Sequence, residues 1–145
     1  METRVNINET EPQAIKAMYA LVGYLETTKL SKTIMELIKI RASQINGCAF
    51  CINMHTTEAL ENGETKQRIF LLNAWRESGL FTEEEKVILS MTEEITLIHN
   101  KGLSDETYQK AAKLFDKNYI SQVIMAIVTI NAWNRIAVAT ELPIG

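Results

Sequence analysis

Two predicted helices of this chain meet in the stretch Arg41-Ala-Ser-Gln-Ile-Asn-Gly-Cys48-Ala-Phe-Cys51-Ile-Asn-Met-His55. Before the turn, apolar residues recur at steps of three and four from Ile34 to Ile45, which is the period of an amphipathic α-helix. Asn46-Gly47 is a pair that commonly ends a helix, so the next helix is expected to begin at about Cys48. The fold is therefore expected to contain two consecutive helices joined by a short turn.

The rest of the chain also predicts helices. Its interior is rich in Ala, Leu, Ile, Met, Glu and Lys, both prolines lie near the ends, and no strand-like alternation persists. Glycines followed by N-cap residues mark three further helix ends, at Gly63, Gly79 and Gly102. The expected helices cover residues 11–28, 31–45, 48–62, 65–78, 83–100, 105–115 and 119–139. We expect one compact all-α domain of about six to seven helices over residues 1–145.

Charge and hydropathy exclude two classes of partner. The formal net charge is −3, with 15 Lys and Arg against 18 Asp and Glu, and no segment concentrates the basic residues; we therefore expect no nucleic acid as partner. The apolar stretch 119–139 contains Asn131, Asn134 and Arg135 and is too polar for a membrane span, so no membrane partner is expected. Residues 1–10 resemble neither a secretory signal nor a transit peptide, which favours a reducing cytoplasmic location.

The same stretch, 119–139, carries apolar residues on more than half of its circumference. One neighbouring helix cannot cover so broad a face. The pattern predicts either a central helix of the subunit or a helix that meets another subunit.

Both cysteines of the chain lie in the turn region, together with one of its two histidines. Cys48, Cys51 and His55 are spaced by three and four residues, so on a helix they share one face and His55 lies beside the Cys51 sulfur. Cys48 is expected near the positive end of the helix dipole, where a thiolate is favoured. In a reducing compartment, a Cys-x-x-Cys pair suits thiol–disulfide exchange better than structural bridging.

Two other interpretations of these residues stay open. The cysteines could be buried simply as small hydrophobic residues. Alternatively, Cys48, Cys51 and His55 could bind zinc with a carboxylate, although structural zinc usually takes its ligands from two separated pairs and the chain has no second Cys/His pair. His99 lies at a predicted helix end, where a cation complements the dipole, and is interpreted as a surface cap. We expect no cofactor and no bound metal.

The chain resembles a known family at these positions. Glu36-(four residues)-Arg41-Ala-Ser43-(four residues)-Cys48-x-x-Cys51-(three residues)-His55 is similar to the core signature of the AhpD-like alkylhydroperoxidases of the carboxymuconolactone decarboxylase superfamily. Later parts of the chain also fit, namely Leu71-Leu-Asn-Ala-Trp75-Arg76, Phe81-Thr-Glu-Glu-Glu85 and Asn131-x-x-Asn134-Arg135. The resemblance thus extends over most of the chain from about Ile34 onward.

This resemblance implies an all-helical subunit that assembles into trimers or hexamers and reduces organic hydroperoxides. By position, Cys51 matches the thiol that attacks the peroxide, Cys48 the resolving thiol, His55 the imidazole that deprotonates Cys51 through water, and Glu36 the relay carboxylate. The implied reductant is a dithiol, such as the dihydrolipoyl group of a lipoyl-carrying protein. Some family members carry a second histidine where this chain has Phe50, so the site is expected to be more apolar here.

Three other functional hypotheses stay open beside the hypothesis of a peroxidase. The protein could be a disulfide-exchange adaptor that passes electrons to a partner protein and has little peroxidase activity. It could be a non-enzymatic helical module that holds a metal ion. A decarboxylase-like member of the superfamily is the poorest match, because the cysteine pair is a feature of the peroxidase branch.

Overall fold

The computed structural model describes residues 3–145, and over this range it contains helices and no strand, as predicted. The elements are α1 (Ile7–Thr10), α2 (Pro12–Glu26), α3 (Lys32–Asn46), α4 (Ala49–Glu61), α5 (Lys66–Phe70), a 3₁₀ turn η1 (Leu72–Ala74), α6 (Trp75–Ser78), α7 (Glu83–Thr96), α8 (Asp105–Leu114) and α9 (Lys117–Ala139). The short helix α1 was not predicted, whereas α2, α3, α4, α8 and α9 lie where the periodicity places them. The all-α class is confirmed.

The single helix predicted over residues 65–78 is wrong. The chain instead forms α5, η1 and α6 in succession. The buried residues of this segment are Ile69, Leu72 and Trp75, which follow one another at intervals of three residues. A 3₁₀ turn has three residues per turn and places such residues on one side, whereas a continuous α-helix would rotate them away from each other. Burial of these three side chains therefore favours the succession of α5, η1 and α6 over one continuous α-helix.

The helix predicted over residues 83–100 ends early, at Thr96. Leu97 and Ile98 that follow are exposed, so further helix would gain little burial. His99 lies in the exposed turn after α7 and makes no hydrogen bond within residues 3–145 that would cap the helix. The C-cap of α7 is Leu97, so His99 lies two residues beyond it, and its exposed position agrees with the interpretation of His99 as a surface residue near the helix end.

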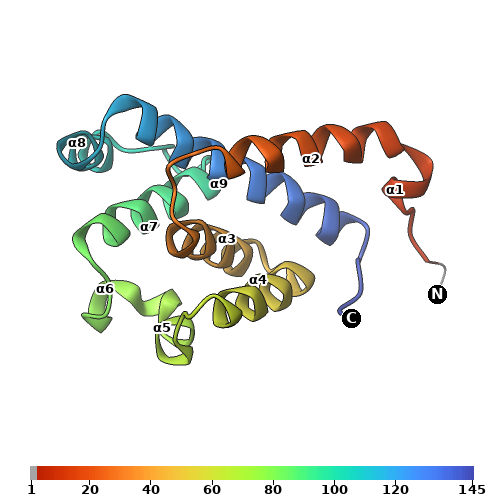
Figure 1. Cartoon of the computed structure of the whole chain (residues 1–145), viewed down its shortest axis with the longest axis horizontal. Coiled ribbons are helices and arrows are strands. Elements are labelled where there is room, and N and C mark those ends of the chain that lie inside the picture. Colours follow the sequence, from red (N-terminus) through yellow and green to blue (C-terminus); the bar gives the residue numbers. More distant parts are fainter. Residues whose placement is uncertain (1–2) are drawn as a thin grey trace.

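Helix α3 lies in the middle of the molecule, with α4 on one side of it, α7 on another, and α9 together with α2 across the top in the view of Figure 1. Its buried face contributes Leu37, Ile38 and Ile40, all at most 1% exposed. Because α4 follows after a single turn, the start of α4 lies at the end of α3. This placement brings the cysteine pair next to the central layer of helices.

Helix α9 is the second central element, since it packs against α3, α7, α2, α4 and α8. Its residues Ile120 and Ile127 are buried in the subunit's own core. By length and composition alone α9 is apolar enough to cross a membrane, but a core helix passes the same test. Of the two predicted roles for this broad apolar helix, the central one is confirmed.

A half-buried carboxylate, that of Glu93, links α3, α6 and α7. Glu93 of α7 accepts hydrogen bonds from Arg41 Nε at 2.9 Å, Trp75 Nε1 at 3.0 Å and Arg76 Nη1 at 2.8 Å. Both Arg41 and Glu93 are largely shielded from water, with side chains 15% and 14% exposed. Removing either side chain would destabilise the fold, because a charge that is shielded from water and has no partner raises the free energy of the folded state.

Candidate functional site

The turn between α3 and α4 places Cys48 at the start of a helix. Gly47 ends α3 in the left-handed conformation, at φ 66°, which a residue with a side chain adopts only with strain. Cys48 is then the N-cap of α4, and its Sγ accepts a hydrogen bond from the backbone N–H of Cys51 at 3.2 Å. The predicted position of Cys48 at the positive end of a helix dipole is confirmed.

Side-chain amides hold this turn against α9. Asn46 Nδ2 donates to Oδ1 of both Asn131 and Asn134 at 2.9 Å, and Asn134 Nδ2 donates to Ser43 Oγ at 3.0 Å. Asn134 is fully buried, so these contacts are shielded from competing water. The network explains in physical terms why these polar residues lie within an otherwise apolar helix, and it positions the end of α3 next to the cysteines.

Cys48 and Cys51 are joined by a disulfide, with Cα atoms 5.3 Å apart. Both are buried, and they pack with Ala137 of α9, while Phe50 covers the cluster from α4. Phe50 contributes apolar surface to this cluster, as the resemblance led us to expect. The cysteine pair is thus set in an apolar environment at the end of the central helix layer.

His55 lies four residues after Cys51 and therefore on the same face of α4. Its side chain is buried, and its Nδ1 atom is 3.4 Å from Oε2 of Glu58. Glu58 was not among the predicted site residues. The signal for it was present as the spacing His55-x-x-Glu58, since residues three apart on a helix are neighbours.

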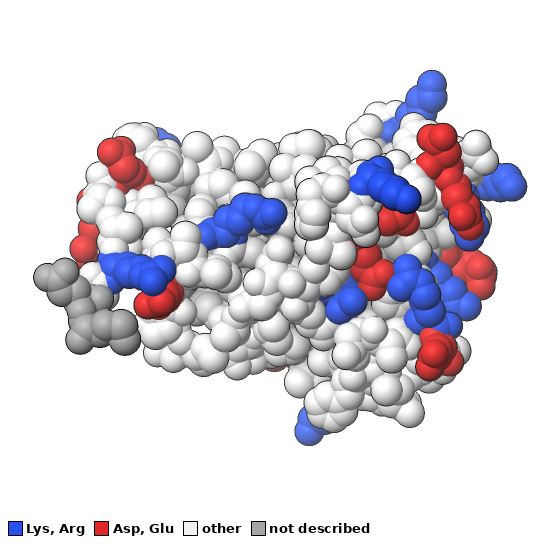
Figure 2. Space-filling view, turned by 180° about the vertical axis from the view of Figure 1, so that it is seen from behind, with Lys and Arg blue, Asp and Glu red and all other residues white. Residues whose placement is uncertain are grey.

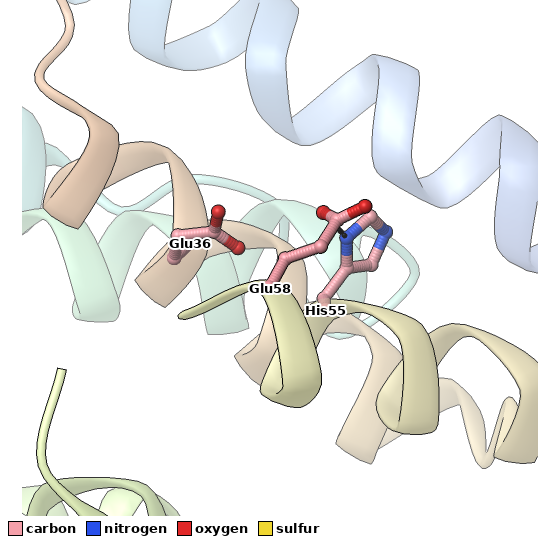
Figure 3. Close-up of side chains that lie close together, drawn as sticks. All are labelled: Glu36, His55 and Glu58. Carbon is pink, nitrogen blue, oxygen red and sulfur yellow. Dashed lines mark hydrogen bonds and ion pairs between the residues drawn. The ribbon is translucent and has the colours of Figure 1, made fainter. Parts of the chain in front are cut away.

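Glu36 approaches the same place from α3, and Figure 3 shows its carboxyl group directed toward the side chains of α4. One donor atom each of Glu36, His55 and Glu58 lies within 4.8 Å of the others. Glu36 is 6% exposed, and its Oε1 accepts a hydrogen bond from Asn62 Nδ2 at 3.4 Å. The structure therefore brings Glu36 close to His55, while the carboxylate within hydrogen-bond distance of the imidazole is Glu58.

The environment shifts the protonation equilibria of this cluster. Burial lowers the pKa of His55, the nearby positive charge of Lys39 lowers it further, and the carboxylate of Glu58 opposes both. Burial raises the pKa of Glu36, an effect that Lys39 counteracts and that the negative charge of Glu58 reinforces. Both shifts favour the uncharged form of the side chain, so the cluster favours a neutral imidazole.

Two hollows lie on the surface near these elements. One, of about 200 Å³, is lined by Cys48, Phe50, Val138 and Leu142 among others, and so reaches the cysteine pair from the side of Cys48. The other is larger, about 690 Å³, and lies between α3, α4 and α5, but none of the predicted site residues lines it. Size alone does not identify the site, and the smaller hollow is the one adjacent to the cysteine pair.

Comparisons with known proteins agree with the fold. The chain is 43% identical over 139 residues to the uncharacterised protein YdfG of Bacillus subtilis, covering 96% of this chain and 95% of that protein. Its structure matches that of a protein of unknown function from Agrobacterium tumefaciens, described as an AhpD-type antioxidant defence protein, with a TM-score of 0.95, 38% identity and 99% of both chains covered. The debrominase Bmp8 shares the fold at a TM-score of 0.83 and 16% identity, with 94% of this chain and 74% of that one covered.

The family model described as the carboxymuconolactone decarboxylase family matches residues 12–94, a range that contains α2, α3, α4 and the cysteine pair. More than half of the chain is matched, and the structural similarity extends over nearly all of it. This chain belongs to the carboxymuconolactone decarboxylase family, as an AhpD-like member.

Proposed function

We propose that this protein is a thiol-dependent peroxidase that reduces organic hydroperoxides with Cys48 and Cys51. The observation that carries the proposal is the position of the two sulfurs, which are within bonding distance of each other at the buried start of α4. Membership in an AhpD-like family supports a peroxidase-type function. A cytoplasmic location remains part of the proposal, because a reducing compartment would keep the pair available for cycling.

The proposed chemistry uses each sulfur once. The Cys51 thiolate attacks one peroxide oxygen, the O–O bond breaks, and the alkoxide leaves and takes up the proton that Cys51 gave to its base, so that Cys51 becomes a sulfenic acid and an alcohol is released. The Cys48 thiolate then attacks the Cys51 sulfur, the S–O bond breaks, a disulfide forms, and the hydroxide takes up the proton lost by Cys48 and leaves as water. An external dithiol returns both cysteines to thiols and is itself oxidised to a disulfide.

His55 would accept the proton of Cys51, in line with its position on the same face of α4. A neutral imidazole whose Nδ1–H faces Glu58 keeps its Nε2 lone pair free to take that proton. Glu36 would act as the relay carboxylate implied by the family resemblance, close to the imidazole but buried on α3. In this arrangement two carboxylates, from two helices, position one base.

Turnover by the purified protein tests the proposal. With cumene hydroperoxide as substrate and dithiothreitol as reductant, peroxide consumption should proceed catalytically and should stop when the thiols are alkylated beforehand. A disulfide-exchange adaptor would instead show rapid reduction of its disulfide by the dithiol and no peroxide consumption above the uncatalysed rate. That second result would contradict the peroxidase proposal.

We further propose that the subunit self-associates, as a trimer or hexamer. Figure 2 shows a face whose middle is sparsely charged, with Lys, Arg, Asp and Glu gathered mainly toward the right of the view. Large apolar side chains stay exposed on two long helices, among them Tyr19 of α2 at 63% and Val128 of α9 at 43%. Sedimentation at micromolar concentration should give three or six times the mass of the chain, whereas a monomer alone would contradict the proposal.

A further inference from the structure

The cluster of Glu36, His55 and Glu58 combines the donor types that transition metals bind. An imidazole nitrogen and two carboxylate oxygens come from adjacent helices, α3 and α4, and lie within 4.8 Å of one another (Figure 3). Three protein ligands with one position left for water form the arrangement of many zinc centres. These ligands differ from the cysteine set, since neither Cys48 nor Cys51 belongs to the cluster.

An unpartnered atom points to a ligand at this place. Oε2 of Glu36 is buried and has no hydrogen-bond partner within the described residues, although the other carboxyl oxygen contacts Asn62. A buried polar atom without a partner costs free energy, and such atoms are uncommon in folded proteins. A cation between Glu36 and the two α4 side chains would satisfy this oxygen.

The spacing of the donor atoms suits a small ion. Ligands about 2.0–2.1 Å from a tetrahedral Zn²⁺ are roughly 3.3 Å from each other. The separation of His55 Nδ1 and Glu58 Oε2 is 3.4 Å, so these two atoms already stand at such a distance. A donor atom of Glu36 lies within 4.8 Å of the other two ligands, and rotation about the side-chain bonds of Glu36 can bring its carboxyl group closer.

Charge and access are also compatible with an ion. Two carboxylates can neutralise a divalent cation, while the positive charge of Lys39 beside the cluster weakens its binding. Glu58 is 46% exposed at its side chain and opens the cluster to solvent. The exposed edge provides both an entry path and room for a water ligand.

We propose that Glu36, His55 and Glu58 form a Zn²⁺-binding site. The mixed nitrogen and oxygen set suits zinc better than Mg²⁺ or Ca²⁺, which prefer all-oxygen sites. Binding follows from the cluster geometry alone; its effect on turnover depends on the proposed function. In a peroxidase, the ion would occupy the imidazole and carboxylates that serve the proton transfer, so zinc would inhibit the reaction reversibly.

Calorimetric titration of the oxidised protein with ZnCl₂ tests the site, because the closed disulfide removes both thiols from competition. We expect one ion per chain and at least a tenfold weaker affinity in Glu58→Gln, which removes a ligand at a half-exposed position. Glu61→Gln is the matched control, since Glu61 lies exposed at the end of the same helix and outside the cluster, and it should bind as the wild type does. The double variant Cys48→Ser/Cys51→Ser should also keep the affinity.

Three results would overturn the proposal: no saturable binding by the oxidised protein, equal affinity in Glu58→Gln and the wild type, or loss of binding in the double cysteine variant. The peroxidase proposal is measured separately, by turnover in the presence of EDTA. Zinc binding without peroxide consumption would refute the peroxidase alone, and turnover without zinc binding would refute the metal site alone.

Discussion

Replacing Cys51 by serine should lower the rate of peroxide consumption by at least roughly three orders of magnitude, because a hydroxyl cannot form the sulfenic acid. Cys48→Ser should instead retain the first step and stop there. Its product would be a single sulfenic acid on Cys51, which dimedone traps and mass spectrometry locates. The structure places both sulfurs at the start of α4, so the comparison is between neighbouring positions.

Two physical effects compete in the choice of nucleophile. Cys48 is the N-cap of α4, and the helix dipole is worth at most about 1–2 kcal/mol to a thiolate there. His55 lies one turn from Cys51 and two from Cys48, and a thiolate–imidazolium pair lowers the pKa of a cysteine far more. A sulfenic acid on Cys48 in the Cys51→Ser variant, with peroxide consumption retained, would mean that Cys48 is the nucleophile and that the helix dipole outweighs the effect of His55.

Replacing Glu93 by alanine should reduce the free energy of unfolding by about 3 kcal/mol, because it leaves the half-buried Arg41 without its carboxylate partner and the indole N–H of Trp75 without an acceptor. Urea unfolding followed by circular dichroism measures this loss. Glu84→Gln is the control, since Glu84 is exposed on the same helix, and it should change stability by less than about 0.5 kcal/mol. Equal stabilities of Glu93→Ala and the wild type would contradict the role assigned to the cluster.

The same carboxylate should make stability depend on pH. Burial alone would raise the pKa of Glu93, but hydrogen bonds from Trp75, Arg76 and Arg41 outweigh burial and hold the pKa below its ordinary value of about 4.5. The folded state then binds the proton less tightly than the unfolded state. The stability that Glu93 contributes is fully present at pH values above its ordinary pKa, and it is lost as the pH falls through the lower pKa of Glu93 in the folded state. Glu93→Gln should therefore show a smaller loss of stability between neutral and acidic pH than the wild type.

Much of the fold could be predicted because helical periodicity and helix-end residues are local signals. The turn at Gly47 shows this, since a helix-ending pair followed by Cys48 predicts both the end of α3 and the start of α4. The break between Phe70 and Trp75 could not be predicted in the same way. It depends on which side chains the core buries, and that selection is made by α3 and α7 from elsewhere in the chain.

The candidate site likewise has features that follow from local sequence spacing and features that depend on how the helices pack. The amino-acid sequence by itself determined the cysteine pair, its place at a helix start and the position of His55 one turn later, because spacing along one helix decides which side chains are neighbours. The same local rule also makes Glu58, three residues after His55 on α4, a neighbour of the imidazole. Only the tertiary structure decided that Glu36 lies close to these two side chains and that one of its carboxyl oxygens is left without a partner within the described residues. The physical reason is that Glu36 reaches the cluster from another helix, so its contacts depend on how α3 packs against α4, and local periodicity does not specify that distance.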